Sequence, residues 1–199
     1  MSLLFIKSLS EHVHLGLWKI DEAIDDYYLL FPHLSQFREF LDRTYKSDVR
    51  KKEFLSVRAL LFNMTHDENS SEISYEPSGK PFMKDYYISI SHTKGFAAVI
   101  LSQTGNVAVD IEYYSTRVQK IVGYFIRSDE QADSLNDQLV NWCAKEVTYK
   151  FFSEENLRYF EMRVHNINKN KCKVDDLETK KTIDVYFNVN SLYTLAYTY

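Results

Sequence analysis

Apolar and polar residues alternate at both ends of the chain, which is the pattern of half-buried strands. Near the N-terminus, the segments LLFIKSL and HVHLGLWKI predict one or two strands. Near the C-terminus, four segments alternate in the same way and predict three or four strands; they are MRVHNI, KCKVDDL, TIDVYFNV and SLYTLAYTY.

Helical spacing of apolar residues is the second pattern. The predicted helices run from an N-cap at Asp21 through Leu30, and over residues 34–45, 47–64, 118–125 and 136–152. The third of these has an apolar stripe along one face, formed by Phe54, Val57, Leu61 and Met64. The first third of the chain is therefore expected to be mostly helical.

The middle of the chain predicts three apolar strands, at 86–91, 96–101 and 107–113, and Thr104-Gly105-Asn106 predicts a tight hairpin between the last two. Helices followed by strands thus occur twice. We expect an α+β fold of two similar halves, 1–105 and 106–199, each a small antiparallel sheet packed by helices.

Composition narrows the class of protein. The chain has 199 residues, a formal net charge of −4 and two cysteines, Cys143 and Cys172. With this net charge, the protein has no overall positive potential that would attract nucleic acid or an anionic membrane. The spacing of the cysteines matches neither a zinc site nor a disulfide framework. No window has the length and apolarity of a membrane span. A cytoplasmic protein with no nucleic-acid or membrane partner is expected.

Acidic residues end the most apolar strand. Asp110 and Glu112 are two apart, so their side chains share one face of the strand, while Ile111 faces the other way. An ordinary exposed strand end would also have such acids. The pair alone therefore leaves both interpretations open.

The helix NWCAKEVTYK adds a second pair of charges. Glu146 and Lys150 are neighbours on the helix surface, and they project among Leu139, Cys143 and Val147 on the apolar side. Charged groups on a core-facing arc are costly to desolvate unless they are paired or bind an ion. Three carboxylates beside a lysine fit a Mg²⁺ site that takes its remaining oxygens from substrate phosphates.

Four motifs in order resemble the surfactin-synthetase-type 4′-phosphopantetheinyl transferases. They are Gly79-Lys80-Pro81, Ser89-Ile90-Ser91-His92, Val107-Ala108-Val109-Asp110-Ile111-Glu112 and the helix Trp142 to Lys150. Phe125 and Glu130 look like a further segment of that family. The resemblance covers about residues 50–150, and Ala108 departs from it because the family usually has Gly there.

The resemblance implies the fold of these transferases, with a ligand cleft between the two halves, and a monomer. It also implies coenzyme A as donor and an apo acyl or peptidyl carrier protein as acceptor. It implies that Asp110, Glu112 and Glu146 hold Mg²⁺, with Mn²⁺ as a second candidate. It also implies that Lys150 neutralises the leaving phosphate and that Glu146 accepts the serine proton. The residues it implies for binding coenzyme A are Lys80, Ser91, His92, Lys145, Arg50 and Arg58. Charge alone points to Arg117, Lys120 or Arg127 for the carrier.

Two other functions fit parts of the sequence. Clustered carboxylates with a lysine also suit a metal-dependent phosphodiesterase or nuclease, but that function explains neither the Gly-Lys-Pro nor the Ser-His element. A module that binds carrier protein or coenzyme A without turnover is the other alternative.

Overall fold

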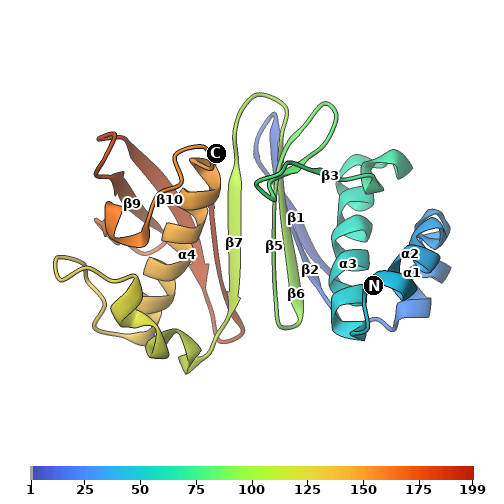
Figure 1. Cartoon of the computed structure of the whole chain (residues 1–199), viewed down its shortest axis with the longest axis horizontal. Helices are drawn as coiled ribbons and strands as arrows, with labels where there is room; N and C mark the ends of the chain where they lie inside the picture. Colours follow the sequence, from blue (N-terminus) through green and yellow to red (C-terminus); the bar gives the residue numbers. More distant parts are fainter. Residues whose placement is uncertain (1) are drawn as a thin grey trace. The chain divides into compact units, whose positions relative to one another are not determined.

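The computed structural model describes residues 2–199, which form two compact units, Met1–Thr104 (unit 1) and Gly105–Tyr199 (unit 2). This boundary lies one residue from the predicted one. Each unit has an antiparallel sheet with one long helix against it (Figure 1). The predicted α+β class is confirmed.

Unit 1 is built on a four-stranded sheet of order β1-β2-β6-β5, in which every pairing is antiparallel. Its elements are β1 (Leu3–Ser10), β2 (Val13–Lys19), α1 (Ile24–Leu30), η1 (Pro32–Phe37), α2 (Arg38–Thr44), α3 (Asp48–Thr65), η2 (Glu68–Ser71), β3 (Ser74–Tyr75), β4 (Pro81–Phe82), β5 (Tyr87–Thr93) and β6 (Phe96–Ser102). The short strands β3 and β4 pair separately.

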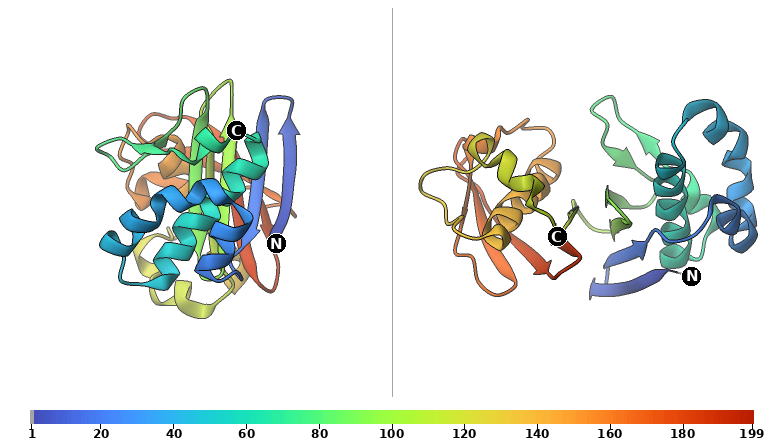
Figure 2. Two further views of the ribbon diagram at one scale, coloured as in Figure 1. Left: turned by 90° about the vertical axis from the view of Figure 1, so that its right-hand side faces the viewer. Right: turned by 90° about the horizontal axis from the view of Figure 1, so that it is seen from below.

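Helix α3 lies along one face of this sheet, with α1 and α2 beyond it (Figures 1 and 2). The predicted stripe is confirmed, because Val57 and Leu61 are buried in the core while Phe54 and Met64 pack against it. Strand β6 supplies the opposing side chains Ala97, Val99 and Leu101. Apolar residues spaced at helical intervals thus meet alternate residues of a strand.

Two helix predictions in unit 1 need correction. Asp21 is not the N-cap, since α1 begins at Ile24 and the backbone N–H of Ala23 donates to Asp26 Oδ2 (2.9 Å). The single helix expected over 34–45 is a 3-10 helix followed by α2. Pro32 starts it two residues early because its fixed φ suits a first turn, and tight 3-10 turns are frequent at helix starts.

The predicted hairpin at 104–106 is wrong. Strand β6 pairs with β2 and β5, whereas β7 (Ala108–Tyr113) belongs to the sheet of unit 2. The two-residue loop instead joins β5 to β6 at Lys94-Gly95, where Gly95 has φ +81°. Turn residues predict where the chain reverses, but they do not predict which strands pair. Strand β6 already has β2 on one edge and β5 on the other, so β7 cannot pair with it.

Unit 2 has a five-stranded sheet of order β7-β11-β10-β9-β8. Its other elements are η3 (Thr116–Lys120), η4 (Val122–Tyr124), α4 (Leu135–Phe151), η5 (Tyr159–Glu161), β8 (Met162–His165), β9 (Lys171–Asp176), β10 (Thr182–Val189) and β11 (Tyr193–Thr198). The four C-terminal strands and the long helix are confirmed. The helix expected over 118–125 is two short 3-10 turns, because only Val118 and Phe125 of this segment reach the core.

Helix α4 packs on one face of this sheet (Figure 1). It begins with a capping box in which Ser134 Oγ accepts the N–H of Asp137 (3.1 Å) and Asp137 Oδ2 accepts that of Ser134 (3.0 Å). Leu139, Cys143 and Val147 are buried, as the helical spacing predicts. Across residues 2–199, none of the helices is long and apolar enough to cross a membrane.

Candidate functional site

The two acids of β7 point toward helix α4. Asp110 lies opposite Ala196 of β11, and Glu112 lies opposite Thr194. Ala108 and Ala196 share that face and belong to the core cluster formed with α4. The methyl group of Ala108 is accommodated there, within a regular strand.

Lys150 ties α4 to β7. Its Nζ donates to Asp110 Oδ1 (2.8 Å) and to the Val109 carbonyl (3.0 Å). Asp110 is only 5% exposed, so this ion pair is screened much less than a surface pair.

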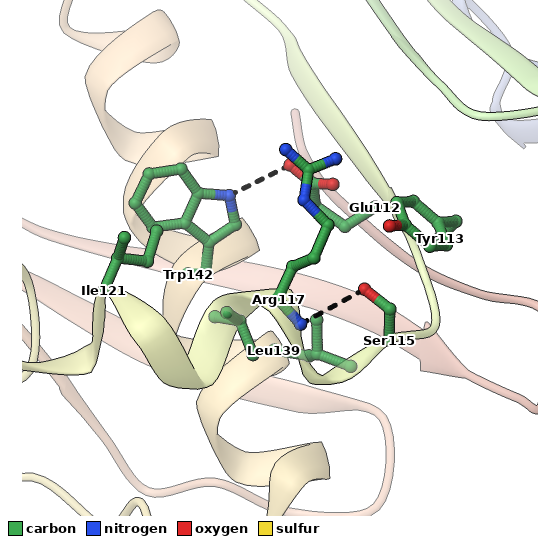
Figure 3. A pocket seen from close by; sticks show the side chains of 8 residues that line it. Glu112, Tyr113, Ser115, Arg117, Ile121, Leu139 and Trp142 are labelled. Carbon is green, nitrogen blue, oxygen red and sulfur yellow. Dashed lines mark hydrogen bonds between the residues drawn. The ribbon is translucent and has the colours of Figure 1, made fainter.

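Glu112 is held by the same helix about two turns earlier. The indole Nε1 of Trp142 donates to Glu112 Oε1 (3.1 Å; Figure 3). The indole packs edge-on against Phe125, with ring centroids 5.0 Å apart.

Glu146 is the third carboxylate of the cluster. Its Oε1 accepts the hydroxyl of Tyr159 (2.6 Å). Burial raises the pKa of Glu146, and the negative charge of Asp110 adds to this, while Tyr159 and Lys150 oppose it. Burial likewise raises the pKa of Cys143 well above its usual value, with further contributions from Asp110 and Glu112. The negative charge of Asp110 thus affects the pKa of both Glu146 and Cys143, and that of Glu112 affects the pKa of Cys143.

This donor set is suited to a hard cation. Carboxylate oxygens are the ligands that Mg²⁺ prefers, and a cation would relieve the repulsion between Asp110 and Glu146. Among residues 2–199, no three His, Cys, Asp or Glu side chains are arranged as a ready coordination sphere. Each of the three carboxylates has one oxygen engaged by a protein donor.

Lys145 requires a correction. It was expected to contact a phosphate, but its side chain is 0% exposed and forms an ion pair with the equally buried Glu130 (2.8 Å). Its Nζ also donates to the carbonyls of Phe125 (2.6 Å) and Tyr159 (3.1 Å). All three donors of the ammonium are used within the protein. Lys145 and Glu130 therefore fasten the loop before α4 to the segment after it.

In unit 1, Glu53 links two of the predicted nucleotide ligands. Its Oε2 lies 2.9 Å from Arg50 Nη1 and 3.5 Å from His92 Nδ1. Glu53 is 8% exposed, so a nearly buried acid sets the position of both basic groups. The structure brings Arg50 and His92 together on this acid.

Arg58 also requires a correction. It is 4% exposed, and its guanidinium lies 3.2 Å from the ring centroid of Phe54 and 5.0 Å from that of Phe37. Burial lowers the pKa of Arg58 to about 10. Its position among aromatic rings corrects the prediction that it contacts a nucleotide.

The other two predicted ligands of unit 1 are placed differently. Lys80 follows a tight turn in which the N–H of Glu76 donates to the Lys80 carbonyl (2.9 Å). Ser91 alternates with His92, so the two side chains lie on opposite faces of the sheet. The structure does not bring Ser91 and His92 to one face.

A pocket of about 260 Å³ opens beside Glu112. In Figure 3, Arg117 extends over it from η3, and Trp142 and Leu139 face it from α4. The remaining lining residues are Tyr113, Ser115, Val118 and Ile121. Polar and apolar surface line the pocket about equally, with one acid and one base at its wall.

Three contributors were missed from the sequence. The spacing of Arg50 and Glu53 is that of an i,i+3 ion pair and could have indicated Glu53. Trp142 entered the sequence prediction only as the first residue of the helix motif, with no role. Nothing in the sequence indicates that Tyr159, thirteen residues after Glu146, reaches back to it.

The site residues therefore form two groups, one in each unit. Unit 2 holds the three acids with Lys150, and unit 1 holds Arg50, Glu53 and His92. Comparison of the chain with protein-family models and with curated proteins gives no match to either.

Proposed function

We propose that this protein is a 4′-phosphopantetheinyl transferase, which moves the phosphopantetheinyl group of coenzyme A to a serine of an apo carrier protein. The observation that carries the proposal is the meeting of Asp110 from β7 with Glu146 and Lys150 from α4. Glu112, the second acid of β7, is held by Trp142 of the same helix. These are the residues that the resemblance assigns to the chemistry. The fold of such transferases is part of the proposal.

Asp110, Glu112 and Glu146 would hold the magnesium ion. When bound, the ion offsets the negative charge that gathers on the diphosphate oxygens as the P–O bond breaks.

The chain's own residues supply positioning and proton transfer. The serine oxygen of the carrier attacks the phosphorus that carries pantetheine, the P–O bond to the other phosphate breaks, and 3′,5′-ADP leaves with that electron pair. Glu146 takes the serine proton, and its raised pKa suits a base working near neutral pH. Lys150 stabilises the leaving phosphate.

The nucleotide end of coenzyme A requires basic groups, and unit 1 offers them. Arg50 and His92 lie on either side of Glu53, which keeps the imidazole ring oriented. Lys80 adds a third positive charge.

The surface that we propose for the carrier protein has both positive charge and exposed apolar area. Arg117 and Lys120 are exposed on η3, and Tyr124 of η4 is 74% exposed. Arg127 is less suited, because its guanidinium pairs with Asp129 (2.9 Å) and donates to the Phe160 carbonyl (2.6 Å). An acidic amphipathic carrier helix would match this surface next to the pocket.

The test incubates the purified protein with coenzyme A, Mg²⁺ and an apo carrier, followed by mass spectrometry of the intact carrier. We expect a mass gain of one phosphopantetheinyl group, which EDTA abolishes and which a carrier without its acceptor serine does not show. Glu146→Gln should abolish transfer, and the exposed-site control Glu154→Gln should not.

The non-catalytic alternative predicts another outcome. If the wild-type protein binds coenzyme A and carrier but leaves the mass of several carriers unchanged, it is a binding module. Glu146→Gln would then leave the affinity for carrier as it was.

A further inference from the structure

We propose that Tyr159 is a positioning residue, which holds Glu146 by one carboxylate oxygen so that the other oxygen is presented to a divalent cation. This inference rests on the proposed function of the site, since it concerns the same carboxylate.

The contact is short and has a defined direction. The Tyr159 hydroxyl lies 2.6 Å from Glu146 Oε1. A phenol donates one proton, and an ionised carboxylate can only accept, so Tyr159 is the donor. The bond occupies Oε1 and leaves Oε2 for the cation.

Tyr159 is itself held in place from several sides. Its ring packs on Trp142, with centroids 5.3 Å apart, and its carbonyl accepts a hydrogen bond from the buried Lys145. The carbonyl of the next residue, Phe160, accepts one from Arg127 Nη1 (2.6 Å). The hydroxyl is therefore fixed by the same ion-pair network that fastens this segment to α4.

Trp142 connects Tyr159 to a second carboxylate of the site, Glu112. The indole donates to Glu112 on one side and contacts the Tyr159 ring on the other, and Tyr159 donates to Glu146. Two of the three carboxylates are thus oriented by one pair of packed aromatic rings. A glutamate has three rotatable bonds, so fixing its carboxylate in advance removes an entropy cost from cation binding.

The test measures Mn²⁺ binding by electron paramagnetic resonance, without coenzyme A or carrier. Tyr159→Phe removes the hydroxyl and keeps the ring, and loss of such a supporting partner typically weakens metal affinity about 10–100-fold. We expect a loss of at least about 10-fold on that basis. Tyr87→Phe, at a tyrosine of unit 1 that is 49% exposed, is the matched control and should bind as the wild type does.

A double-mutant cycle separates positioning from a general structural effect. In the Glu146→Gln background, Tyr159→Phe should change Mn²⁺ affinity no further, because the carboxylate that it positions is gone. An equal loss in both backgrounds overturns the proposal. So does unchanged affinity in Tyr159→Phe, a Tyr159→Phe protein that does not fold, or a wild-type protein that binds no Mn²⁺.

Transfer assays distinguish this inference from the proposed function. If the wild-type protein binds Mn²⁺ in a Tyr159-dependent way but transfers no phosphopantetheine, the proposed function fails and the inference stands. If it transfers the group and Tyr159→Phe binds Mn²⁺ and transfers equally well, only the inference fails.

Discussion

Lys145 and Glu130 form a buried ion pair in unit 2, each with a 0% exposed side chain. Both side chains form further hydrogen bonds with the protein backbone. Lys145 donates to two carbonyls besides Glu130, and Glu130 accepts the N–H groups of Arg127 and Val164, both at 2.7 Å. Such a pair is tolerated in a core because its partners compensate for the loss of water.

Replacing Lys145 alone should be severe. Lys145→Met leaves Glu130 as an unpaired buried acid, and breaking a buried pair in this way costs about 3–5 kcal/mol. We expect that loss in the free energy of unfolding measured with urea. The double variant Lys145→Met, Glu130→Gln should be more stable than Lys145→Met, and a less stable double variant would contradict this account.

Asp176 makes stability depend on pH. Burial by itself would raise the pKa of this acid, but hydrogen bonds from Thr179 and from the N–H of Glu178 (2.9 Å) outweigh it and lower the pKa. A group with a lowered folded-state pKa contributes stability above its unfolded pKa of about 3.9, and this is lost as the pH falls through the folded value.

Asp176→Asn should therefore destabilise the protein by about 1 kcal/mol near pH 7, as expected for loss of a charge-assisted hydrogen bond. The difference from the wild type should shrink below pH 4, where the acid of the wild type becomes protonated. Urea unfolding at several pH values measures both. A difference that stays constant down to pH 2 would show that the charge has no role.

Helix α3 and strand β2 approach each other closely at Gly16. A Cβ atom built there would lie 2.8 Å from Leu60 Cδ1 and 2.8 Å from Met64 Sδ. Leu60 is completely buried, while Met64 is only partly so and can move. The absence of a side chain at Gly16 lets the helix sit on the sheet.

Gly16→Ala should destabilise unit 1 by about 1 kcal/mol, at the low end of the cost of overpacking a core because methionine adapts. The control is Gly105→Ala, where an added Cβ has nothing within 4 Å. Thermal unfolding of both variants makes the comparison. Equal midpoints for the two would mean that α3 shifts to accept the methyl group.

Helix α4 shows how an element combines stability and chemistry. Its buried stripe of Leu139, Cys143 and Val147 holds it to the sheet. Glu146 and Lys150 flank that stripe, and the packing that buries the stripe carries them to β7. The packing of α4 on the sheet therefore also sets where the backbone of Glu146 and Lys150 lies beside β7.

The molecule as a whole separates its two groups of site residues between two units. The proposed function assigns binding of the nucleotide to unit 1 and the reacting phosphates to unit 2. Kinetic constants can distinguish these roles, because lost binding in the ground state raises KM, whereas lost stabilisation of the transition state lowers kcat.

His92→Ala should raise KM for coenzyme A about 10–100-fold, the effect of losing a charged hydrogen bond, with kcat nearly unchanged. Lys150→Ala should instead lower kcat, because its charge is needed as the phosphate leaves. Steady-state kinetics with varied coenzyme A measures both constants for each variant. A fall in kcat alone for His92→Ala would place that residue with the chemistry.

Periodicity along the chain was enough to predict the α+β class, the four C-terminal strands, α3 and α4 almost to the residue. It also predicted that Asp110 and Glu112 share a face and that Glu146 and Lys150 flank a buried stripe. These features follow from local geometry, since strand alternation and helical spacing depend on neighbouring residues alone.

Features that depend on distant partners could not be predicted in this way. Lys145 follows the same local rules whether its ammonium meets a phosphate or Glu130, and the motif suggested the wrong one of the two. The same holds for Arg58 between aromatic rings and for the pairing of β6. Which groups meet is decided when the whole chain packs, because each buried donor must then find an acceptor among residues far away in the sequence. Tyr159 on Glu146 is the clearest case.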